Sequence, residues 1–282
     1  MLTSRFAPSP TGQLHLGHAY SAALAHEVAR KDGGKFLLRI EDLDQTRCRP
    51  EFVTGLKADL RWLGLRWDGE PLVQSDRRAI YGDALEKLRD EHCLYPCFCT
   101  RSDIAAALSA PHGPAATHYP GTCRELPEDP DRRAAMPHSW RLNAAKAIER
   151  VGLPTWTEFE GEKFAAAITD IDDEILARKD TAASYHLACV VDDARSGVSL
   201  VVRAMDLRPS TPVQRLLQML LGLREPAYLH HGLVVHQDGR RLAKRDKAPT
   251  LAMLRESGVD GPSLAGQLLD GRLPAGFRLA EA

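Results

Sequence analysis

A pair of histidines lies three residues apart behind a Pro/Gly-rich turn near the start of the chain. The run reads Pro8-Ser-Pro-Thr-Gly-Gln-Leu-His15-Leu-Gly17-His18 and follows a short segment, residues 3–7, that we predict to be a strand. Where such a turn opens a helix, free backbone N–H groups and the helix dipole favour an anion, and residues three apart share one face. Gly17 has no side chain, so a flat nucleotide can lie close to the backbone. The run therefore fits phosphate contacts by His15 and His18; a surface turn with two histidines is the alternative.

A strongly basic loop lies near the other end of the chain. It reads Arg240-Arg-Leu-Ala-Lys244-Arg-Asp-Lys247. Residues 195–256 hold 11 Lys and Arg against five Asp and Glu, whereas the whole chain has a net charge of −1. This local excess indicates a polyanionic partner for the C-terminal half. Taken alone, the run is also compatible with a solvated basic loop that has no ligand.

Three of the six cysteines have the close spacing of metal ligands. Cys97 and Cys99 are separated by one residue, and Cys123 follows in the same Pro-rich region. Zinc takes four N, S or O ligands in a tetrahedron, and thiolates at short spacing supply them. On chemistry alone His118 is the ordinary choice of fourth ligand, and three reduced structural cysteines are the alternative to a metal site. The other cysteines lack such spacing and are expected to be packing residues: Cys48, Cys93 and Cys189.

The elements that must position these residues alternate along the first third of the chain. Their order predicts an α/β fold in which a parallel sheet carries helices on its faces. The expected segments there are strands 3–7 and 36–40 and helices 15–31, 50–63 and 76–91. Those expected later are a regular segment at 168–176, helices at 184–191, 210–223 and 251–256, a strand at 198–202 and a hairpin at 231–242 with its turn at Asp238-Gly239. The last 20 residues carry little signal.

Residues 92–165 interrupt this alternation. They hold four cysteines, many prolines and little periodicity, which indicates an insertion. With 282 residues the chain is long enough for one large or two modest domains. We divide it into the first half of an α/β domain at 1–92, the insertion at 93–165, the second half of the domain at 166–225 and a C-terminal segment at 226–282.

The composition is that of an ordinary folded protein. The residues are 44% hydrophobic and 27% charged, which argues against disorder, collagen and a disulfide-stabilised miniprotein. The N-terminus lacks an apolar signal segment, and no apolar stretch approaches the roughly 18 residues of a membrane span. We therefore expect a cytoplasmic protein with reduced or metal-bound cysteines and no membrane partner. We also expect a monomer.

The histidine pair and the basic loop together resemble the paired signatures of class I aminoacyl-tRNA synthetases. His15-Leu-Gly-His18 is similar to the first signature, and the loop around Lys244 is similar to the mobile lysine loop. Arg5-Phe-Ala-Pro-Ser-Pro-Thr-Gly and Arg39-Ile-Glu-Asp-Leu-Asp-Gln-Thr-Arg narrow the resemblance to the glutamyl/glutaminyl branch. The resemblance covers the chain up to about residue 255. It implies a Rossmann-type catalytic domain with an inserted zinc-bearing subdomain and a small helical C-terminal part.

The short remainder after the lysine loop narrows the resemblance further. Only 35 residues follow Lys247, whereas glutamyl-tRNA synthetases of full length continue into a helical anticodon-binding region. In this the chain resembles the glutamyl-Q tRNA(Asp) synthetase family, which activates glutamate with ATP without tRNA and attaches it to queuosine at the wobble position of tRNA(Asp). The implied partners are ATP, L-glutamate and queuosine-bearing tRNA(Asp). The alternatives are a short glutamyl-tRNA synthetase that charges tRNA(Glu) and an inactive paralogue that binds RNA.

The resemblance also implies which residues form the site. Glutamate has two carboxylates and an ammonium group, so its pocket needs an acid and arginine, which binds a carboxylate in a bidentate fork. Arg5 and Arg203 would take the carboxylates and Glu41 the ammonium group, at strand ends where open α/β sheets bind ligands. The other implied roles are glutamate contacts by Ala7, Ser9 and Tyr185; ATP contacts, with Mg²⁺, by Gly17 and by the catalytic residues His15, His18 and Lys244; and one structural zinc ion on Cys97, Cys99, Tyr119 and Cys123.

Three positions depart from the family pattern. Arg241 stands where lysine is usual, Ala243 where serine is common, and Ala204 where the family has glycine. Lys244 remains, so we expect activity to survive with altered closure of the loop. The extra methyl group of Ala204 is expected to tighten the substrate pocket.

Overall fold

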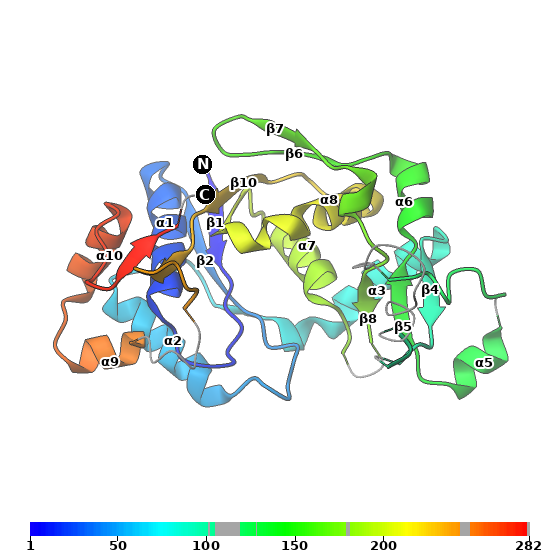
Figure 1. Ribbon diagram of the computed structural model, residues 1–282, viewed down its shortest axis with the longest axis horizontal. Helices are drawn as coiled ribbons and strands as arrows, with labels where there is room; N and C mark the ends of the chain where they lie inside the picture. The colour runs from blue at the N-terminus through cyan, green and yellow to red at the C-terminus, as the bar shows by residue number, and fades with distance from the viewer. Residues whose placement is uncertain (101, 105–118, 128, 179–180, 243–248, 281–282) are drawn as a thin grey trace.

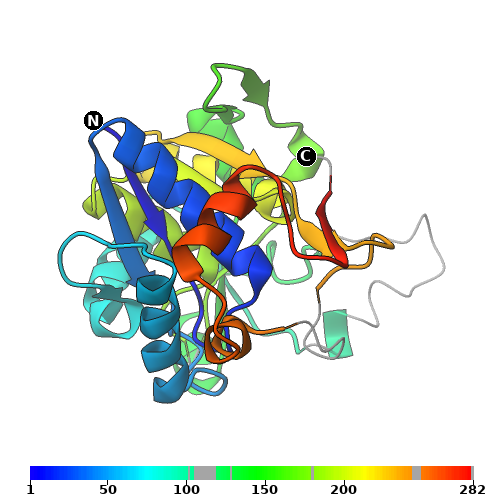
Figure 2. The same cartoon turned by 90° about the vertical axis from the view of Figure 1, so that its left-hand side faces the viewer.

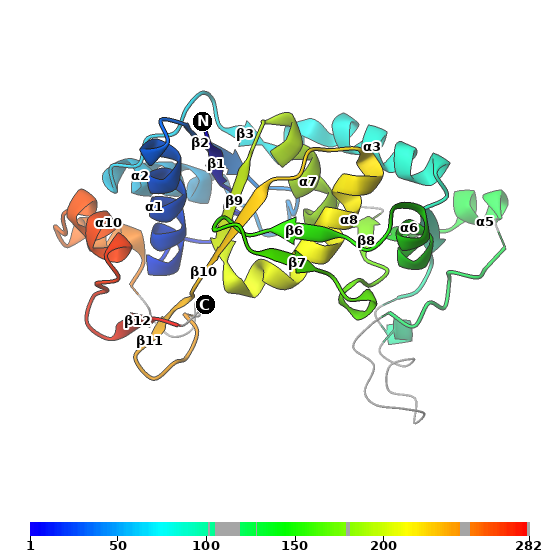
Figure 3. The same cartoon turned by 90° about the horizontal axis from the view of Figure 1, so that it is seen from above.

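The centre of the molecule is formed by two parallel ladders of strands that lie side by side (Figure 1, Figure 3). Strands β1 (Thr3–Phe6), β2 (Lys35–Ile40) and β3 (Leu72–Val73) form one ladder, and β9 (Leu200–Ala204) and β10 (Ala227–His231) form the other. The Ser199 amide donates to the Thr3 carbonyl (2.9 Å), which sets β9 beside β1. The strand order β3-β2-β1-β9-β10 confirms the predicted parallel arrangement. The computed structural model describes residues 1–100, 102–104, 119–127, 129–178, 181–242 and 249–280.

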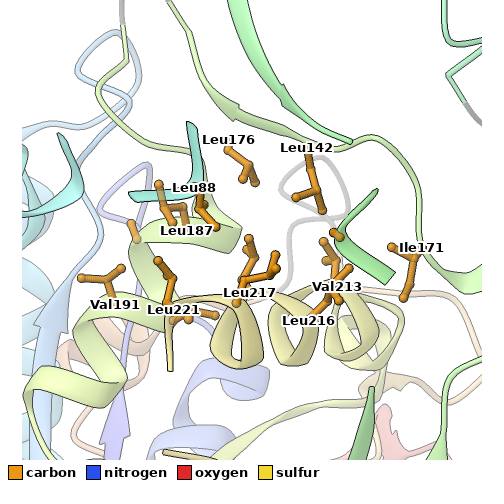
Figure 4. Close-up of a cluster of buried hydrophobic side chains, with 14 of the residues drawn as sticks. Leu88, Leu142, Ile171, Leu176, Leu187, Val191, Val213, Leu216, Leu217 and Leu221 are labelled. Carbon is orange, nitrogen blue, oxygen red and sulfur yellow. The ribbon is translucent and has the colours of Figure 1, made fainter. Parts of the chain in front are cut away.

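Helices cover both faces of these strands. In Figure 3, α1 (Leu16–Lys31) and α7 (Tyr185–Arg195) lie on opposite sides of β1 and β9. Along β9, Leu200 and Val202 pack into the core that contains α1. Val201 packs instead into the core that α7 and α8 (Thr211–Leu221) share, part of which is drawn in Figure 4. Successive strand residues thus face opposite cores, as expected where both faces of a sheet are covered.

Local signals explain where the helices begin and end. Helices α2 (Pro50–Trp62) and α8 carry proline in the first turn, where a backbone N–H has no intrahelical partner. Helix α8 ends at Gly222, whose φ of 67° suits glycine. Helix α3 (Arg78–Asp90) follows the 3₁₀ turn Gln74–Arg77. The structure confirms, to within two residues at each end, the helices predicted at 15–31, 50–63, 76–91 and 210–223.

The interrupted region forms a separate antiparallel sheet, at the right of Figure 1. Strand β5 (Ser139–Leu142) pairs with β4 (Leu94–Cys97) on one side and β8 (Ile175–Ala177) on the other. This sheet therefore includes a strand beyond residue 165. The regular structure expected at 168–176 is present in part, as a 3₁₀ turn at Ile168–Asp170 and the start of β8. The other elements of the region are α5 (Pro130–Ala135), α6 (Ala144–Val151), β6 (Thr155–Thr157) and β7 (Lys163–Ala165).

The C-terminal segment packs against α1 (Figure 2). Its elements are β11 (Val234–His236), α9 (Leu251–Glu256), α10 (Gly261–Leu269) and β12 (Phe277–Leu279). The predicted hairpin at 231–242 is only partly right. Its turn is present, since the His236 amide donates to the Arg240 carbonyl (2.9 Å), but His231 ends β10 and the antiparallel partner of β11 is β12. Among the residues described, no helix combines the length and apolar character that crossing a lipid bilayer requires.

Candidate active site

A cavity of about 680 Å³ opens at the C-terminal ends of β1 and β9. The turn after β1, the first turn of α1 and the start of α7 bound it, which is where open α/β sheets bind ligands. Every described residue that the sequence assigns to glutamate or ATP lines this cavity: Arg5, Ala7, Ser9, His15, Gly17, His18, Glu41, Tyr185 and Arg203. Lys244, assigned to ATP, and the neighbouring Ala243 lie outside the described residues.

His15 and His18 are held against each other at the start of α1. Nδ1 of His15 accepts a hydrogen bond from the Gly17 amide (3.2 Å), and the His15 amide donates to Nδ1 of His18 (3.2 Å). The two ring centroids lie 3.8 Å apart. Because Nδ1 accepts in both rings, the proton of each neutral imidazole sits on Nε2, which is then a donor. The helix cap thus orients two donors beside a helix N-terminus that favours an anion.

Gly17 stands in close contact with the His15 ring. A Cβ at this position would lie 3.1 Å from Cε1 and 3.2 Å from Nδ1 of His15. We expect Gly17→Ala to displace the ring from its cap and to lower the unfolding free energy by about 1 kcal/mol, the usual effect of losing an N-cap. Urea unfolding would measure this.

The matched control for this change is Gly55→Ala in α2, where no atom beyond the helix's own nearby backbone lies within 4 Å of the added Cβ. That variant should gain about 0.5–1 kcal/mol, because alanine favours a helix interior over glycine. An equal gain in both variants would contradict the tight contact at Gly17.

Arg5 is buried and already neutralised by a carboxylate. Its Nε and Nη2 donate to the two oxygens of Asp193 on α7 (2.9 and 3.2 Å), and its Nη1 donates to the Val202 carbonyl (3.3 Å). Arg39 donates to the same carboxylate and also to Oε1 of Glu41. Burial alone would raise the pKa of Asp193, but the charges of Arg39 and Arg5 outweigh it and hold that pKa well below its usual range. Asp193 is therefore the anion that fixes Arg5.

Glu41 follows β2 and has one engaged carboxylate oxygen. Oε1 accepts from Nε and Nη2 of Arg39 (3.2 and 2.9 Å), and among the described residues Oε2 has no hydrogen-bond partner. Burial raises the pKa of Glu41, and the charge of Arg39 reduces that effect. A cationic group in the cavity would stabilise the ionised carboxylate. The arrangement thus fits the ammonium contact implied by the sequence.

Arg203 differs from Arg5 because no carboxylate contacts its guanidinium group among the described residues. Arg203 lies at the end of β9 and is only 4% exposed, so its guanidinium group is buried. A buried charge is costly unless an opposite charge comes to it, so Arg203 is well placed to bind the carboxylate of a ligand. Its present partners are all neutral: Gln214 Oε1 (2.7 Å), Thr211 Oγ1 (2.8 Å), His230 Nε2 (3.1 Å) and Tyr185 OH (3.5 Å).

His230 supports Arg203 from the side of β10. Its Nε2 accepts from Nε of Arg203, so the neutral ring carries its proton on Nδ1, which lies 2.8 Å from Oε1 of Glu158. Burial lowers the pKa of His230 to about 4, and the charge of Arg203 acts in the same direction. At neutral pH the ring is therefore uncharged, and it holds Arg203 in place without adding to the positive charge.

Three further residues of interest, Tyr185, Ala204 and Arg241, line the wall of the cavity. Burial raises the pKa of Tyr185 to about 12, so its hydroxyl stays protonated at neutral pH. Ala204 and Arg241, which depart from the family pattern, both line the cavity. Nη1 of Arg241 lies 3.8 Å from a carboxylate oxygen of Asp206.

The buried charges around the cavity leave one positive charge in excess. Arg5 and Arg39 are matched by Asp193 and Glu41, whereas Arg203 has no anionic contact among the described residues. A ligand with one net negative charge and groups of both signs complements this set. An acidic amino acid, with two carboxylates and one ammonium group, has that composition.

Comparison with known proteins identifies the family. Residues 1–265 match the sequence model described as "tRNA synthetases class I (E and Q), catalytic domain". The chain belongs to this family. This confirms the resemblance to class I aminoacyl-tRNA synthetases that the two signatures indicate, and the chain is called the synthetase from here on.

Curated relatives match most of the synthetase. It is 45% identical over 270 residues to the protein named "Glutamyl-Q tRNA(Asp) synthetase" of Rhodobacter capsulatus, covering 92% of the synthetase and 96% of the relative. The protein of that name from Nocardia farcinica is 46% identical over 269 residues, which cover 94% of the synthetase and 83% of that relative. The crystal structure of glutamate-tRNA synthetase from Elizabethkingia anophelis matches with a TM-score of 0.81 and 27% identity, over 95% of the synthetase and 61% of that chain. The synthetase thus spans about three fifths of that solved relative.

A second candidate site of the synthetase is a group of three cysteines next to β4. The sulfur atoms of Cys97, Cys99 and Cys123 lie within 4.8 Å of one another. The hydroxyl oxygen of Tyr119 lies 3.3 Å from Sγ of Cys97 and 3.4 Å from Sγ of Cys99. Thiolates bound tetrahedrally to one zinc ion at about 2.3 Å lie about 3.8 Å apart, so these donors fit a metal ion. His118, the other candidate for fourth ligand, lies outside the described residues.

Sequence reasoning did not find the residues that hold the cavity's arginines. The signal for Asp193 was available, because Asp192 and Asp193 directly follow the helix predicted at 184–191, which the structure extends to Arg195. Arg39 stands in a motif that the sequence analysis quotes, but the motif does not reveal its contact with Asp193, and His230 carried no local signal, since both roles depend on elements brought together in space. Of the cysteines expected to pack, Cys93 and Cys189 are buried and Cys48 is half-buried.

Proposed function

We propose that the synthetase activates L-glutamate with ATP, without needing tRNA, and transfers it to queuosine at the wobble position of tRNA(Asp). The names of the relatives from Rhodobacter capsulatus and Nocardia farcinica support the substrate and the acceptor. The observation that carries the proposal for glutamate is the buried Arg203, which has no carboxylate partner among the described residues and faces a cavity with one positive charge in excess.

In the first step, an oxygen of the glutamate α-carboxylate attacks the α-phosphorus of ATP. The bond from that phosphorus to the bridging oxygen breaks, and pyrophosphate leaves with the electron pair. Arg203 and Arg5 hold the carboxylates, and Glu41 binds the ammonium group. His15 and His18, with the N-terminus of α1, stabilise the charge that spreads over the phosphates. Catalysis is then mostly positioning, since no residue of the protein acts as a nucleophile.

Two further groups assist this step. ATP enters with Mg²⁺, which neutralises charge on the phosphate oxygens. Lys244 is assigned to the phosphates by its motif, although it lies outside the described residues. Ala7, Ser9, Gly17 and Tyr185 complete the walls around the two substrates, which is the role that the sequence assigns to them.

In the second step, a hydroxyl oxygen of queuosine attacks the carbonyl carbon of glutamyl-adenylate. A new ester C–O bond forms, the C–O bond to the phosphate breaks, and AMP leaves with the electron pair. The proton of the hydroxyl passes to the departing phosphate or to water. The released AMP and the ester account for every atom of the adenylate and the acceptor.

Isotope exchange between pyrophosphate and ATP tests the first step. We expect exchange that depends on L-glutamate and occurs with no tRNA present. Transfer of labelled glutamate tests the second step, and we expect label on tRNA(Asp) that carries queuosine but not on tRNA(Asp) that lacks it. Label on the 3′ end of tRNA(Glu) would instead support a short glutamyl-tRNA synthetase. RNA binding without any exchange would support an inactive paralogue.

We also propose that Cys97, Cys99, Tyr119 and Cys123 hold one structural zinc ion. The group lies in the insertion, and none of its members lines the cavity of the active site. We expect Cys99→Ala to abolish zinc binding and to lower the unfolding free energy by roughly 4 kcal/mol, as losses of structural metals do. Elemental analysis of the purified protein and urea unfolding would measure the two effects.

The control for the zinc prediction is Cys48→Ala, because Cys48 is half-buried and outside the group. This variant should keep about one zinc ion per chain. Full zinc content in Cys99→Ala would contradict the proposed ligand set. The monomeric state and the cytoplasmic location remain predictions, and light scattering of the purified protein would check the first.

A further inference from the structure

The tip of the hairpin formed by β6 and β7 lies against β10 (Figure 3). The Phe159 amide donates to the Tyr228 carbonyl (2.7 Å), which fixes the hairpin two residues before His230. Residues two apart in a strand face the same side, and the rings of Tyr228 and His230 are stacked with their centroids 5.8 Å apart. Glu158, which directly follows β6, is thereby brought beside His230.

One carboxylate oxygen of Glu158 faces two ring N–H groups. Oε1 lies 2.8 Å from Nδ1 of His230 and accepts a hydrogen bond from Nε1 of Trp156 (3.2 Å). Trp156 is itself buried and stacks on Phe164, so this donor has a fixed position. Nε of Arg208 lies 3.9 Å from the same oxygen. Glu158 is thus held as an acceptor for Nδ1 of His230.

These contacts fit only one protonation state of the His230 ring. Burial lowers the pKa of His230 to about 4, so the ring carries a single proton at pH 7. A proton on Nε2 would face the Nε–H of Arg203 (3.1 Å), which can only donate, and would leave the lone pair of Nδ1 against Glu158. A proton on Nδ1 satisfies both neighbours. The Thr211 hydroxyl, 3.4 Å from Nε2, can then donate to it as well.

The intervening histidine lets an acid support Arg203 without neutralising it. Asp193 contacts Arg5 directly and occupies both its Nε and its Nη2. A carboxylate in the same position on Arg203 would compete with the carboxylate of a ligand. The neutral ring of His230 instead fixes the guanidinium group and leaves its charge to the cavity. Neither Glu158 nor His230 lines that cavity, so both lie behind Arg203.

We propose that Glu158 is a positioning residue for glutamate binding: it keeps the proton of His230 on Nδ1, so that Nε2 accepts from Arg203 and fixes the guanidinium group for a carboxylate of the substrate. This inference rests on the proposed function. The hairpin of β6 and β7 then serves the amino-acid site, although no residue of that hairpin lines the cavity. The alternative is a purely structural role of Glu158 in attaching the hairpin to β10.

The variant Glu158→Ala separates the two roles. We expect its KM for glutamate in the exchange reaction to rise about tenfold, the effect of losing one hydrogen bond to a charged group. Its KM for ATP and its kcat should stay within about twofold of those of the unmodified synthetase, because Arg203 is not assigned to ATP. Glu160→Ala is the matched control, since it removes the same charge from an exposed position of the same hairpin, and it should change none of these constants.

The conservative variant Glu158→Gln tests the hydrogen bond itself. Because Oε1 accepts from Trp156 and faces the N–H of His230, the amide oxygen of glutamine can take the same place. This variant should keep the KM for glutamate within about threefold of the unmodified value. A KM as high as in Glu158→Ala would overturn the proposal, because the charge of Glu158 and not its accepted hydrogen bond would then be responsible.

Heteronuclear NMR of nitrogen-labelled histidine reports the position of the ring proton without any activity measurement. The signals of His230 are those absent from His230→Gln. At pH 7 we expect the proton on Nδ1 in the unmodified synthetase, and a larger share on Nε2 in Glu158→Ala. A proton on Nε2 in the unmodified synthetase, or an unchanged spectrum in the variant, would contradict the proposed role of Glu158.

The outcomes distinguish this inference from the function on which it rests. If the unmodified synthetase shows no glutamate-dependent exchange, the proposed function fails, and calorimetric titration with L-glutamate then measures the effect of Glu158→Ala as a change in Kd. If exchange occurs and Glu158→Ala leaves the KM for glutamate unchanged, the role of Glu158 is wrong. Equal increases in the KM for glutamate and ATP would also overturn it, because they would indicate the purely structural role.

Discussion

Replacing Arg203 with lysine is expected to raise the KM for glutamate about 100-fold in the exchange reaction, with little change in the KM for ATP. Lysine keeps the positive charge but loses the planar fork that binds a carboxylate through two parallel hydrogen bonds. It also cannot serve Gln214 and Thr211 while facing the cavity. Hydrogen bonds to charged groups contribute about 1.5–3 kcal/mol, which corresponds to roughly 10- to 160-fold in binding.

The control for this change is Arg195→Lys, because Arg195 lies exposed at the end of α7. This variant should show unchanged constants for both substrates. Equal increases in the KM for glutamate and ATP in Arg203→Lys would indicate a general distortion of the cavity. An unchanged KM for glutamate would remove Arg203 from the glutamate site altogether.

The sequence predicts those elements whose ends carry local signals. Helix α1 begins after a Pro/Gly turn and stops before Gly33, and both limits were recognised. Helix α10 is the exception: Asp260 caps its start and Pro262 lies in its first turn, but these local signals were not recognised. The strands of the insertion were missed because β4 and β5 have only four residues each and pair across more than 40 residues of sequence.

The candidate site was predictable where strand ends carry it. Arg5 and Arg203 lie near the C-terminal ends of β1 and β9, and Glu41 directly follows β2, so the fold brings them to one edge. Their electrostatic roles were not predictable, because charge pairing is a property of the assembled structure. The sequence treats Arg5 and Arg203 alike, but Asp193, which lies 188 residues from Arg5, neutralises only the former. The distinction between them requires the position of α7 against β1.

Asp193→Asn should be among the most destabilising single changes at the site. Asp193 is 4% exposed, and its carboxylate accepts hydrogen bonds from Arg5 and Arg39. Asparagine keeps the shape of the side chain but removes its charge. The buried guanidinium groups of Arg5 and Arg39 would then have a single carboxylate nearby, that of Glu41, which contacts Arg39. Breaking a buried ion pair from one side costs about 3–5 kcal/mol. Urea unfolding at pH 7 would measure this loss, and exposed Asp90→Asn should stay within about 0.5 kcal/mol of the unmodified synthetase.

The pH dependence of this difference identifies the charge of Asp193 as its cause. The pKa of Asp193 in the folded protein lies below its unfolded value of about 3.9, because Arg39 and Arg5 outweigh the effect of burial. The ionised carboxylate therefore stabilises the fold fully above about pH 5, and this contribution is lost as the pH falls towards the folded pKa. The stability gap between Asp193→Asn and the unmodified synthetase should accordingly shrink below about pH 4. A gap that stays constant down to pH 2 would mean that the variant is destabilised by packing, and Arg5 would then not depend on the charge of α7.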